Sequence, residues 1–382
     1  MRKSGLRVAK KLNADVVDGI SIARHVRAIK PYQAVSSLDA MRSDPERESF
    51  KIDWNEATVP PSPAVTKAVM NFLSSSQHLN LYPVLNSTNL IARLAKHHGL
   101  PESQFLVTNG SDDALNTICG TYLDEGDQVL MVSPTYQHFL VFVQSRGATV
   151  EHFYGRDPFQ PDIDGLLQTA ARMRPRIIYL ANPNNPTGVL YSVDSLRRLL
   201  DANPTSLVIV DEAYSEFAGQ SARQLLYTYS NLIITRTFSK AYGMAGLRIG
   251  YAMADARLIT NLRRLFNPKN VNALAQVAAI AALDDSEWLS WYLSEVEKSK
   301  ALITRWFTER DIECRMTPAN FFMVRFERAP WVVRCLREQG VYVRDRSTMP
   351  CLNGFVRFSI GTVEQTKKIL DRTGVVLQRL NR

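Results

Sequence analysis

Short apolar runs alternate with longer amphipathic stretches between Leu106 and Tyr251. Runs such as Leu232-Ile233-Ile234-Thr235 are typical of strands that are buried on both faces. We expect strands at residues 105–108, 128–132, 149–153, 176–180, 207–210, 232–235 and 248–252. Helices are expected at residues 112–123, 136–145, 163–172 and 192–202, the last capped by Ser192. This alternation predicts an α/β fold with a mostly parallel sheet that helices cover on both faces.

The pattern changes after Asn272. Two helical stretches, 273–283 and 287–310, precede shorter strands at 321–326, 341–344 and 355–360. We therefore expect a smaller α+β domain at residues 273–382, after a large domain at 55–272. Residues 1–54 are mostly polar and charged, and we interpret them as an N-terminal arm that packs on the small domain. A short helix is expected in the arm near residues 20–29.

The composition excludes some classes of protein. A chain of 382 residues that is 45% hydrophobic can bury a large core, and no stretch approaches the roughly 18 consecutive apolar residues that a membrane span needs. The basic segment from Met1 to Lys11 has no apolar run behind it, so it does not resemble a secretory signal. We expect a cytoplasmic protein that does not bind a membrane.

Cysteine spacing and charge give no metal site and no nucleic-acid motif. The four cysteines are scattered, without a zinc spacing, and predict reduced thiols. The net charge of +9 is compatible with nucleic acid, with small anionic substrates or with a solvated basic face. Because no basic stripe with interleaved aromatic residues occurs, we predict no nucleic-acid partner. The absence of a zinc spacing leads us to predict no metal.

Candidate chemistry follows the predicted strand at 232–235. Thr237, Ser239, Lys240 and Arg248 place two hydroxyls, a lysine and an arginine in a short window. Hydroxyls and an arginine can hold a phosphate. A lysine beside them suggests a phosphorylated aldehyde cofactor that is bound covalently, namely pyridoxal 5'-phosphate (PLP). Alone, the window favours this interpretation only slightly over an ordinary surface lysine.

Three further segments follow predicted strands. Gly110 and Ser111 open a helix, where free backbone N–H groups bind anions, although a plain capped helix fits equally well. The loop that contains Asn185 is rich in Pro and Gly, and an amide there can bind a phenolic oxygen; the alternative is an ordinary turn. Asp211 follows a buried run and needs a cationic partner such as a pyridinium nitrogen, unless it only caps the next helix.

The order of four motifs resembles one family. Asn-Pro-x-Asn-Pro-Thr-Gly, Asp-Glu-Ala-Tyr, Thr-Phe-Ser-Lys and Gly-Leu-Arg-Ile-Gly-Tyr occur in this order, each near a predicted strand. They resemble the fold-type I PLP-dependent aminotransferases, with the greatest likeness to the histidinol-phosphate aminotransferases. The resemblance runs from about Asn55 to Thr362. It implies a seven-stranded, mostly parallel sheet in the large domain and amino transfer from glutamate or a similar donor to a keto acid or phosphorylated keto compound.

The resemblance also implies residue roles. Lys240 is similar to the lysine that binds the cofactor and moves the proton, Asp211 to the partner of the ring nitrogen, and Tyr214 with Asn185 to the ligands of the ring oxygen. The implied phosphate ligands are Gly110, Ser111, Asp112, Thr237, Ser239 and Arg248, and the implied stacking aromatic is Tyr136. Arg357 and Arg344 resemble the arginines that bind substrate anions. Tyr82 resembles a tyrosine that reaches the partner subunit's cofactor, which implies a homodimer with shared active sites.

Two segments depart from the family pattern and leave the substrate open. Ala57-Thr58 follows Asn55-Glu56 where histidinol-phosphate enzymes usually show Asn-Pro, and Lys269 stands where many show Tyr. Lys269 either adds a cation for an acidic substrate or points into solvent. Another PLP reaction on the same fold, such as decarboxylation, cyclisation or oxidation of an amino acid, therefore stays an alternative. A regulatory protein with a PLP fold is a weaker one, because the arm is too short and too polar for a DNA-binding domain.

Overall fold

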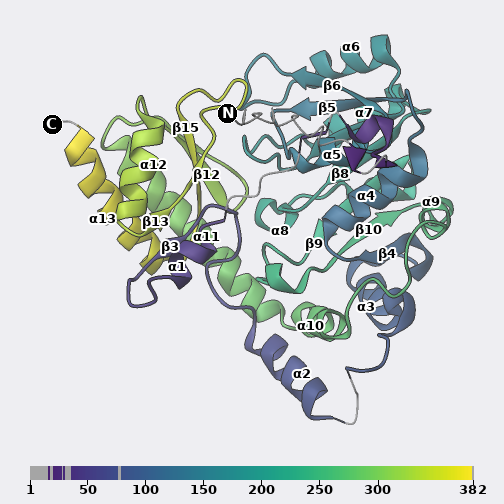
Figure 1. Ribbon diagram of the computed structural model, residues 1–382, viewed down its shortest axis with the longest axis horizontal. Coiled ribbons are helices and arrows are strands. Elements are labelled where there is room, and N and C mark those ends of the chain that lie inside the picture. The colour runs from purple at the N-terminus through teal and green to yellow at the C-terminus, as the bar shows by residue number, and fades with distance from the viewer. Residues whose placement is uncertain (1–15, 18–19, 28, 31–35, 76–78, 381–382) are drawn as a thin grey trace, which may run out of the picture.

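The computed structural model describes residues 16–17, 20–27, 29–30, 36–75 and 79–380. Figure 1 shows a larger and a smaller part side by side. Helices α10 (Ala273–Asp284) and α11 (Ser286–Thr308) lead from the larger part to the smaller one. Within the described residues, no helix combines the length and the apolar composition needed to cross a bilayer.

The larger part is built on a seven-stranded sheet. From edge to edge its strands are β4 (Phe105–Thr108), β10 (Gly250–Ala254), β9 (Leu232–Thr237), β8 (Leu207–Asp211), β7 (Ile177–Ala181), β5 (Gln128–Ser133) and β6 (Thr149–Tyr154). Strands β6, β5, β7, β8 and β9 pair in parallel, and β10 is antiparallel to both of its neighbours. The predicted fold class is thus confirmed.

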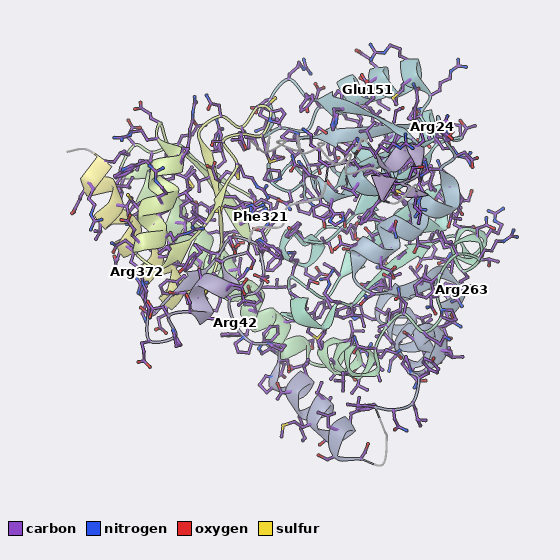
Figure 2. The ribbon with its side chains drawn as sticks, in the orientation of Figure 1. Arg24, Arg42, Glu151, Arg263, Phe321 and Arg372 are labelled. Atoms are coloured by element: carbon purple, nitrogen blue, oxygen red, sulfur yellow. The ribbon has the colours of Figure 1, made fainter. Side chains whose placement is uncertain are left out.

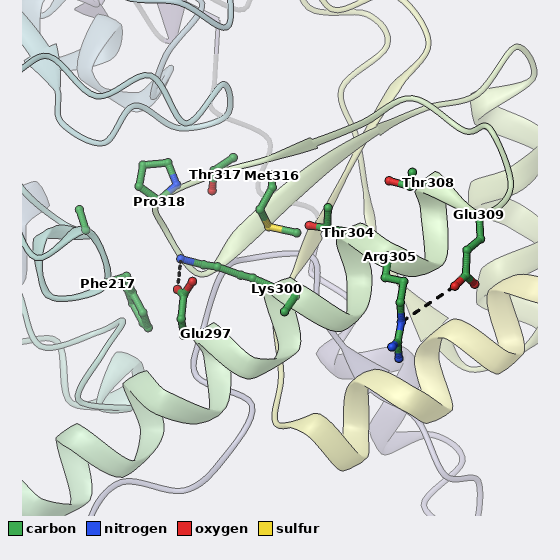
Figure 3. A pocket seen from close by; sticks show the side chains of 12 residues that line it. Phe217, Glu297, Lys300, Thr304, Arg305, Thr308, Glu309, Met316, Thr317 and Pro318 are labelled. Atoms are coloured by element: carbon green, nitrogen blue, oxygen red, sulfur yellow. Dashed lines mark ion pairs between the residues drawn. The ribbon is translucent and has the colours of Figure 1, made fainter.

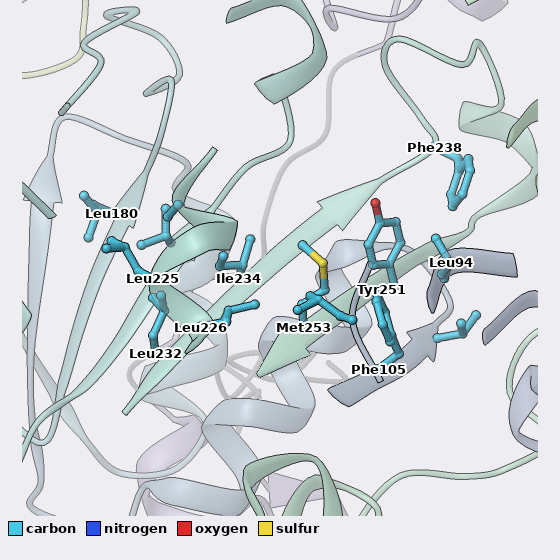
Figure 4. Close-up of a cluster of buried hydrophobic side chains, with 14 of the residues drawn as sticks. Leu94, Phe105, Leu180, Leu225, Leu226, Leu232, Ile234, Phe238, Tyr251 and Met253 are labelled. Carbon is cyan, nitrogen blue, oxygen red and sulfur yellow. The ribbon is translucent and has the colours of Figure 1, made fainter. Parts of the chain in front are cut away.

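Two hydrophobic clusters cover the two faces of this sheet. Neighbouring residues of β9 alternate between them: Ile233 packs in one cluster and Ile234 in the other. The cluster around Ile233 includes side chains of α4 (Ser111–Tyr122), α5 (His138–Gln144) and α9 (Ala256–Leu262). The cluster around Ile234, drawn in Figure 4, includes side chains of α3 (Thr88–His98), α6 (Ile163–Met173), α7 (Val193–Ala202) and α10. Burial on both faces explains why the strands are continuously apolar.

The smaller part contains an antiparallel sheet and three helices. Its strand order is β11 (Cys314–Met316), β12 (Phe321–Arg325), β15 (Phe355–Ser359) and β14 (Arg344–Asp345). Helices α11, α12 (Ala329–Glu338) and α13 (Val363–Leu380) pack with it in a separate hydrophobic cluster.

The end of the arm packs on the smaller part. Strand β3 (Phe50–Lys51) pairs in parallel with β13 (Val341–Tyr342), and Phe50 and Ile52 are buried in the cluster of that part. Figure 2 shows Arg42 beside the smaller part but Arg24 over the larger one. Among the described residues of the arm, therefore, only those at its end pack on the smaller part. Residues 1–15 lie outside the described residues.

The described residues also contain elements that belong to neither sheet. They are β1 (Val16–Val17), β2 (Ile20–Ser21), α1 (Leu38–Arg42), α2 (Pro63–Ser74), α8 (Ser215–Ala218) and five 3-10 turns at Arg24–Val26, Leu85–Ser87, Glu102–Gln104, Ala222–Tyr227 and Ala245–Leu247. The predicted helix at residues 20–29 is wrong, because a strand and a single 3-10 turn stand there. Residues 20–27 are exposed and bury no apolar face, and a short helix needs such burial for stability.

Most predicted boundaries differ from the structure by one or two residues. The Oγ of Ser192 accepts the backbone N–H of Ser195 at 3.1 Å, which confirms the predicted cap of α7. The predicted strand at 248–252 begins only at Gly250. Arg248 has a left-handed backbone with φ of 51°, so it does not extend the strand, and its side chain donates to Ser239 and Asp112.

Gly188 marks a close approach of the two parts. Its φ is 75°, and a Cβ there would lie 2.4 Å from the Cβ of Thr317. We expect Gly188→Ala to lower the free energy of unfolding by more than the roughly 1–2 kcal/mol that a left-handed alanine costs, because Thr317 must also move. Gly219→Ala is the control, since φ is 63° and its Cβ would meet no atom within 4 Å. Urea unfolding compares the two variants, and equal losses would contradict the close contact.

Candidate active site

A cavity of about 520 Å³ lies between the carboxyl ends of β7, β8 and β9 and the strands of the smaller part. The residues predicted from the sequence that line it are Ser111, Asp112, Tyr136, Asn185, Asp211, Tyr214, Thr237, Ser239, Lys240, Arg248, Arg344 and Arg357. Gly110 is adjacent to Ser111, and Tyr82 does not line the cavity. Segments that are far apart in sequence therefore meet at one place.

A second groove, of about 720 Å³, is more open to solvent and lies between α8, α11 and the segment after β11. Its charged side chains pair with one another, Lys300 with Glu297 at 3.1 Å and Arg305 with Glu309 at 4.0 Å (Figure 3). None of the residues predicted from the sequence lines this groove. We therefore place the chemistry in the smaller cavity.

Lys240 lies three residues beyond the end of β9. Its Nζ donates a hydrogen bond to the backbone carbonyl of Trp54 at 2.9 Å and lies 5.8 Å from the centroid of the Tyr214 ring. Burial, together with the positive charge of Arg357, lowers the pKa of Lys240 to about 8. An amine with this pKa is partly unprotonated near neutral pH, which both a nucleophile and a general base require.

The start of α4 and the segment after β9 form a cradle for an anion. Gly110 precedes the helix with φ of 82° and provides no side-chain cap for the first N–H groups, and the helix begins at the cavity, which Ser111 and Asp112 line. A Cβ on Gly110 would lie 2.7 Å from Nη2 of Arg248. Thr237 donates to Ser239 at 2.9 Å, and Arg248 donates to the same hydroxyl at 3.4 Å. Backbone amides, hydroxyls and a guanidinium thus converge, as a phosphate monoester requires.

Asp211 is a buried carboxylate at the end of β8. It accepts hydrogen bonds from the hydroxyls of Tyr179 at 3.2 Å and Thr235 at 3.0 Å. Within the described residues, no lysine or arginine forms an ion pair with it, and burial raises the pKa of Asp211 to about 6. Tyr179 is itself held by its stack on Phe139, with ring centroids 3.9 Å apart. The carboxylate is well fixed in position and lacks a cation.

Tyr214 and Asn185 approach the cavity with their polar atoms held by other residues. The hydroxyl of Tyr214 accepts a hydrogen bond from Nδ2 of Asn55 at 3.1 Å. Oδ1 of Asn185 accepts from Nη1 of Arg357 at 2.5 Å. The predicted ring ligand Asn185 and the predicted substrate ligand Arg357 are therefore in direct contact, which the sequence did not indicate.

Tyr136 is connected to the anion cradle through Asp112. The Tyr136 hydroxyl donates to Oδ1 of Asp112 at 2.7 Å, and Arg248 donates to Oδ2 at 3.1 Å. Asp112 thus orients both the predicted stacking ring and the predicted phosphate arginine.

Sequence reasoning missed several residues that line the cavity. They are Trp54, Glu56, Thr135, Gln137, His138, Ala181, Ala213, Ala245, Gly246 and Arg346. The spacing of Arg346 from Arg344 was an available signal, because residues two apart in an extended segment share a face. With Arg357, three arginines face the same cavity from the smaller part.

Tyr82 and Lys269 lie elsewhere on the surface. The side chain of Tyr82 is 77% exposed, and Nζ of Lys269 lies 4.6 Å from the centroid of its ring. Lys269 is exposed and does not line the cavity of its own chain.

The residues around the cavity fit PLP. The buried Asp211 lacks the cation that a protonated pyridine nitrogen supplies. The uncapped start of α4, with Ser239 and Arg248, matches a phosphate group, and Lys240 has the lowered pKa that favours bonding to an aldehyde.

Known proteins resemble the chain over most of its length. The family model described as aminotransferase class I and II matches residues 49–372. A dihydroxyacetone phosphate transaminase of Campylobacter jejuni is 33% identical over 91% of this chain and 95% of its own length. A histidinol-phosphate aminotransferase of Bacillus subtilis is 33% identical over 91% of this chain and 98% of its own. The structure of a histidinol-phosphate aminotransferase from Sinorhizobium meliloti, solved with PLP, superposes with a TM-score of 0.84 at 24% identity, over 94% of this chain and 98% of that one.

The lowered pKa of Lys240 predicts how fast PLP attaches at different pH. Only the neutral amine attacks an aldehyde, so the rate of attachment to cofactor-free protein should rise with pH and level off above about pH 8. An unperturbed lysine would level off only near its ordinary pKa of about 10.4. Arg357→Met removes a charge that lowers the pKa, so its plateau should begin at higher pH. Arg305→Met, in the other groove, serves as the control. A rate that still rises above pH 10 in the unmodified protein would contradict the lowered pKa.

Proposed function

The chain belongs to the class I and II aminotransferase family, and on this basis we propose that it moves an amino group from a donor such as glutamate to a phosphorylated keto compound. It is a PLP-dependent transaminase. The observation that carries the choice of acceptor is the group of three arginines, Arg344, Arg346 and Arg357, that face the cavity in addition to the phosphate cradle of the cofactor.

The names of two relatives narrow the chemistry of the acceptor. One relative is named for histidinol phosphate and another for dihydroxyacetone phosphate, and each is 33% identical to this chain. The keto form of histidinol phosphate and dihydroxyacetone phosphate share one unit, a ketone next to a methylene that carries a phosphate ester. We therefore propose that the acceptor contains this acetol phosphate unit, which a doubly charged phosphate and several arginines suit well.

Lys240 performs the proton transfer in this proposal. When bound, PLP supplies an electron-withdrawing ring that stabilises negative charge on the substrate carbon. Lys240 would hold the cofactor through its Nζ and would be released when the amino group of the donor takes its place. The Nζ of Lys240 has a lowered pKa and hydrogen-bonds the Trp54 carbonyl. Once released, it can take the proton from the substrate carbon and pass it to the cofactor.

The other residues hold the cofactor and keep its charge distribution. Asp211 would pair with the ring nitrogen and keep it protonated. Asn185 and Tyr214 would donate to the ring oxygen, and Tyr136 would stack on the ring. The start of α4, together with Thr237, Ser239 and Arg248, would hold the phosphate, and Asp112 orients Arg248.

The substrate site and the cofactor site share Arg357. Its contact with Asn185 means that replacing Arg357 also disturbs a ligand of the cofactor. Arg344 and Arg346 are therefore the better positions at which to test the substrate phosphate.

We also propose a homodimer in which Tyr82 reaches the partner subunit's cofactor. Four exposed apolar side chains lie next to it in sequence, with exposed fractions of 63% at Leu79, 65% at Leu81, 47% at Val84 and 51% at Leu85. Apolar side chains that gather on a surface favour a protein interface. A second copy of the chain is the proposed cover, and the pairing of Lys269 with Tyr82 would lie in that interface.

Two coarser predictions complete the proposal. The hydrophobic cluster of the smaller part is separate from those of the larger part, which supports division into an arm, a large domain and a small domain near residues 54 and 272. Free thiols at Cys119, Cys314, Cys335 and Cys351 support a reducing compartment such as the cytoplasm.

The acceptor is tested with glutamate and a panel of ketones. Glutamate alone should convert the bound cofactor to its amine form, and dihydroxyacetone phosphate or the keto form of histidinol phosphate should restore it. We expect Arg344→Met and Arg346→Met each to raise KM for the phosphorylated ketone by roughly 10–100-fold, the range for loss of a charged hydrogen bond. The dissociation constant of PLP should change little, and Arg305→Met is the matched control.

Three outcomes would contradict this assignment. If no donor yields the amine form, the reaction is not transamination, and release of carbon dioxide would indicate a decarboxylase instead. If unphosphorylated ketones are accepted equally well, the acetol phosphate class is wrong. If the arginine variants lose PLP while KM is unchanged, these arginines do not bind the substrate.

The shared active site is tested by mixing inactive and weakened subunits. Lys240→Ala removes turnover, and Tyr82→Phe should weaken PLP binding. If Tyr82 acts on the partner, a hybrid of one subunit of each kind contains one intact site, so mixing should restore activity at limiting PLP. If Tyr82 acts within its own chain, or plays no part, mixing should give no gain over the separate variants.

A further inference from the structure

The end of the arm crosses the active site and contacts both parts of the molecule. The backbone carbonyl of Asp53 accepts from Nη2 of Arg357 at 2.5 Å, and the next carbonyl, of Trp54, accepts from Nζ of Lys240 at 2.9 Å. Asn55 follows directly, and its side chain reaches Tyr214. Three consecutive residues therefore touch the proposed substrate arginine, the proposed catalytic lysine and a proposed cofactor ligand.

Asn55 is fixed in place by contacts on all of its polar groups. It is fully buried, with an exposed fraction of 0%. Its N–H donates to Oγ of Ser359 at 2.9 Å, and its carbonyl accepts from Nδ2 of Asn320 at 3.1 Å. Its Oδ1 lies 3.2 Å from Oγ of Ser359, whose single proton is shared between this oxygen and the carbonyl of Ile52 at 3.0 Å. The fourth group, Nδ2, donates to the hydroxyl of Tyr214 at 3.1 Å. In this structure the amide of Asn55 is held with its nitrogen towards Tyr214.

A second anchor fixes the chain just after Asn55. Thr58 donates from Oγ1 to Oε1 of Gln365 at 2.6 Å, and Nε2 of Gln365 donates back to the carbonyl of Thr58 at 3.0 Å. Thr58 belongs to the segment that departs from the family pattern. In this chain, the hydrogen bonds of Thr58 therefore help to hold the nearby Asn55 in place.

The direction of the Asn55–Tyr214 hydrogen bond controls where the tyrosine proton points. An amide nitrogen only donates, and a phenol has a single proton. Because the hydroxyl of Tyr214 accepts from Asn55, its proton is left to donate to another acceptor. Tyr214 is buried, lines the cavity and packs edge-to-face on Phe321 with ring centroids 5.2 Å apart, so the acceptor has to lie on the cavity side.

We propose that Asn55 is a positioning residue that makes Tyr214 a hydrogen-bond donor to the ring oxygen of the bound cofactor. This rests on the proposed contact of Tyr214 with that oxygen. A donor stabilises the anionic form of a phenolic oxygen, which favours loss of the proton that the oxygen shares with the nitrogen of Lys240. Asn55 therefore influences the acidity of the cofactor without touching it.

The sharpest test is Asn55→Gly. Asn55 has a left-handed backbone, with φ of 56°, and glycine adopts this conformation without strain, so the variant removes the amide and leaves the path of the chain intact. The absorbance of the lysine-bound cofactor is titrated with pH. We expect the midpoint to rise by about half to one pH unit, the equivalent of one ordinary hydrogen bond. The charged groups near Tyr214, namely Arg357, Arg346, Asp211 and Lys240, are unchanged in the variant.

Tyr214→Phe separates this inference from the proposed cofactor site. Its midpoint should rise at least as far as that of Asn55→Gly, and the double variant should rise no further than Tyr214→Phe alone, because Asn55 acts only through the hydroxyl. Asn55→Asp, which replaces the donor by an acceptor and keeps the size, should raise the midpoint as well. Asp311→Gly is the matched control, since it relieves a left-handed backbone, with φ of 52°, on an exposed turn and should leave the midpoint unchanged.

Each alternative result has a definite meaning. If Tyr214→Phe leaves the midpoint unchanged, the contact of Tyr214 with the cofactor is wrong and the inference falls with it. If Tyr214→Phe raises the midpoint but Asn55→Gly leaves it unchanged or lowers it, the cofactor site stands and the role of Asn55 is refuted. The same holds if the effects of the two substitutions add in the double variant. Thermal unfolding of the cofactor-free variants shows that each one folds, and Asn55→Asp replaces Asn55→Gly if the latter does not.

Discussion

A carboxylate buried at the end of a strand is stable only if hydrogen bonds and a cation compensate for its charge. Asp211 is such a carboxylate, and the rest of the site depends on it. The hydroxyls of Tyr179 and Thr235 fix its position, and the stack of Tyr179 on Phe139 extends that support into the packed face of the sheet. The cation has to come from the cavity. The position of Asp211 on β8 therefore sets where the cavity would accommodate a cationic group, and the start of α4 and the lysine after β9 line the same cavity.

The cavity exists only because two hydrophobic cores meet. The large sheet supplies the carboxylate, the lysine and the cradle, whereas the smaller part supplies the arginines. The end of the arm joins them, since Asp53 and Trp54 accept hydrogen bonds from Arg357 and Lys240. Relative movement of the two parts would change these contacts first. The site is thus held by backbone carbonyls as well as by side chains.

Local pattern predicted the strands of the large sheet and many of the residues that line the cavity. The strands were recognisable because burial on both faces makes them continuously apolar, and their ends identified Asp211 and Lys240 as candidates. Contacts between distant segments had no such signal. The pairing of Arg357 with Asn185 and of Asn55 with Tyr214 depends on how the smaller part docks, and the predicted helix in the arm failed because helix propensity there is not supported by burial. Roles that need a second subunit, such as that of Tyr82, lie beyond a single chain.

The contact between Arg357 and Asn185 also limits how such a site can diversify. With the proposed roles of these two residues, a mutation of the arginine would alter the surroundings of the cofactor together with those of the substrate, so selection for a new substrate could not act on it freely. Strand β14 and the loop after it line the cavity from the same side, and their arginines are not the ones that hydrogen-bond Asn185. Divergence among paralogues that exchange one phosphorylated ketone for another should therefore accumulate around Arg344 and Arg346, while Arg357 is inherited unchanged.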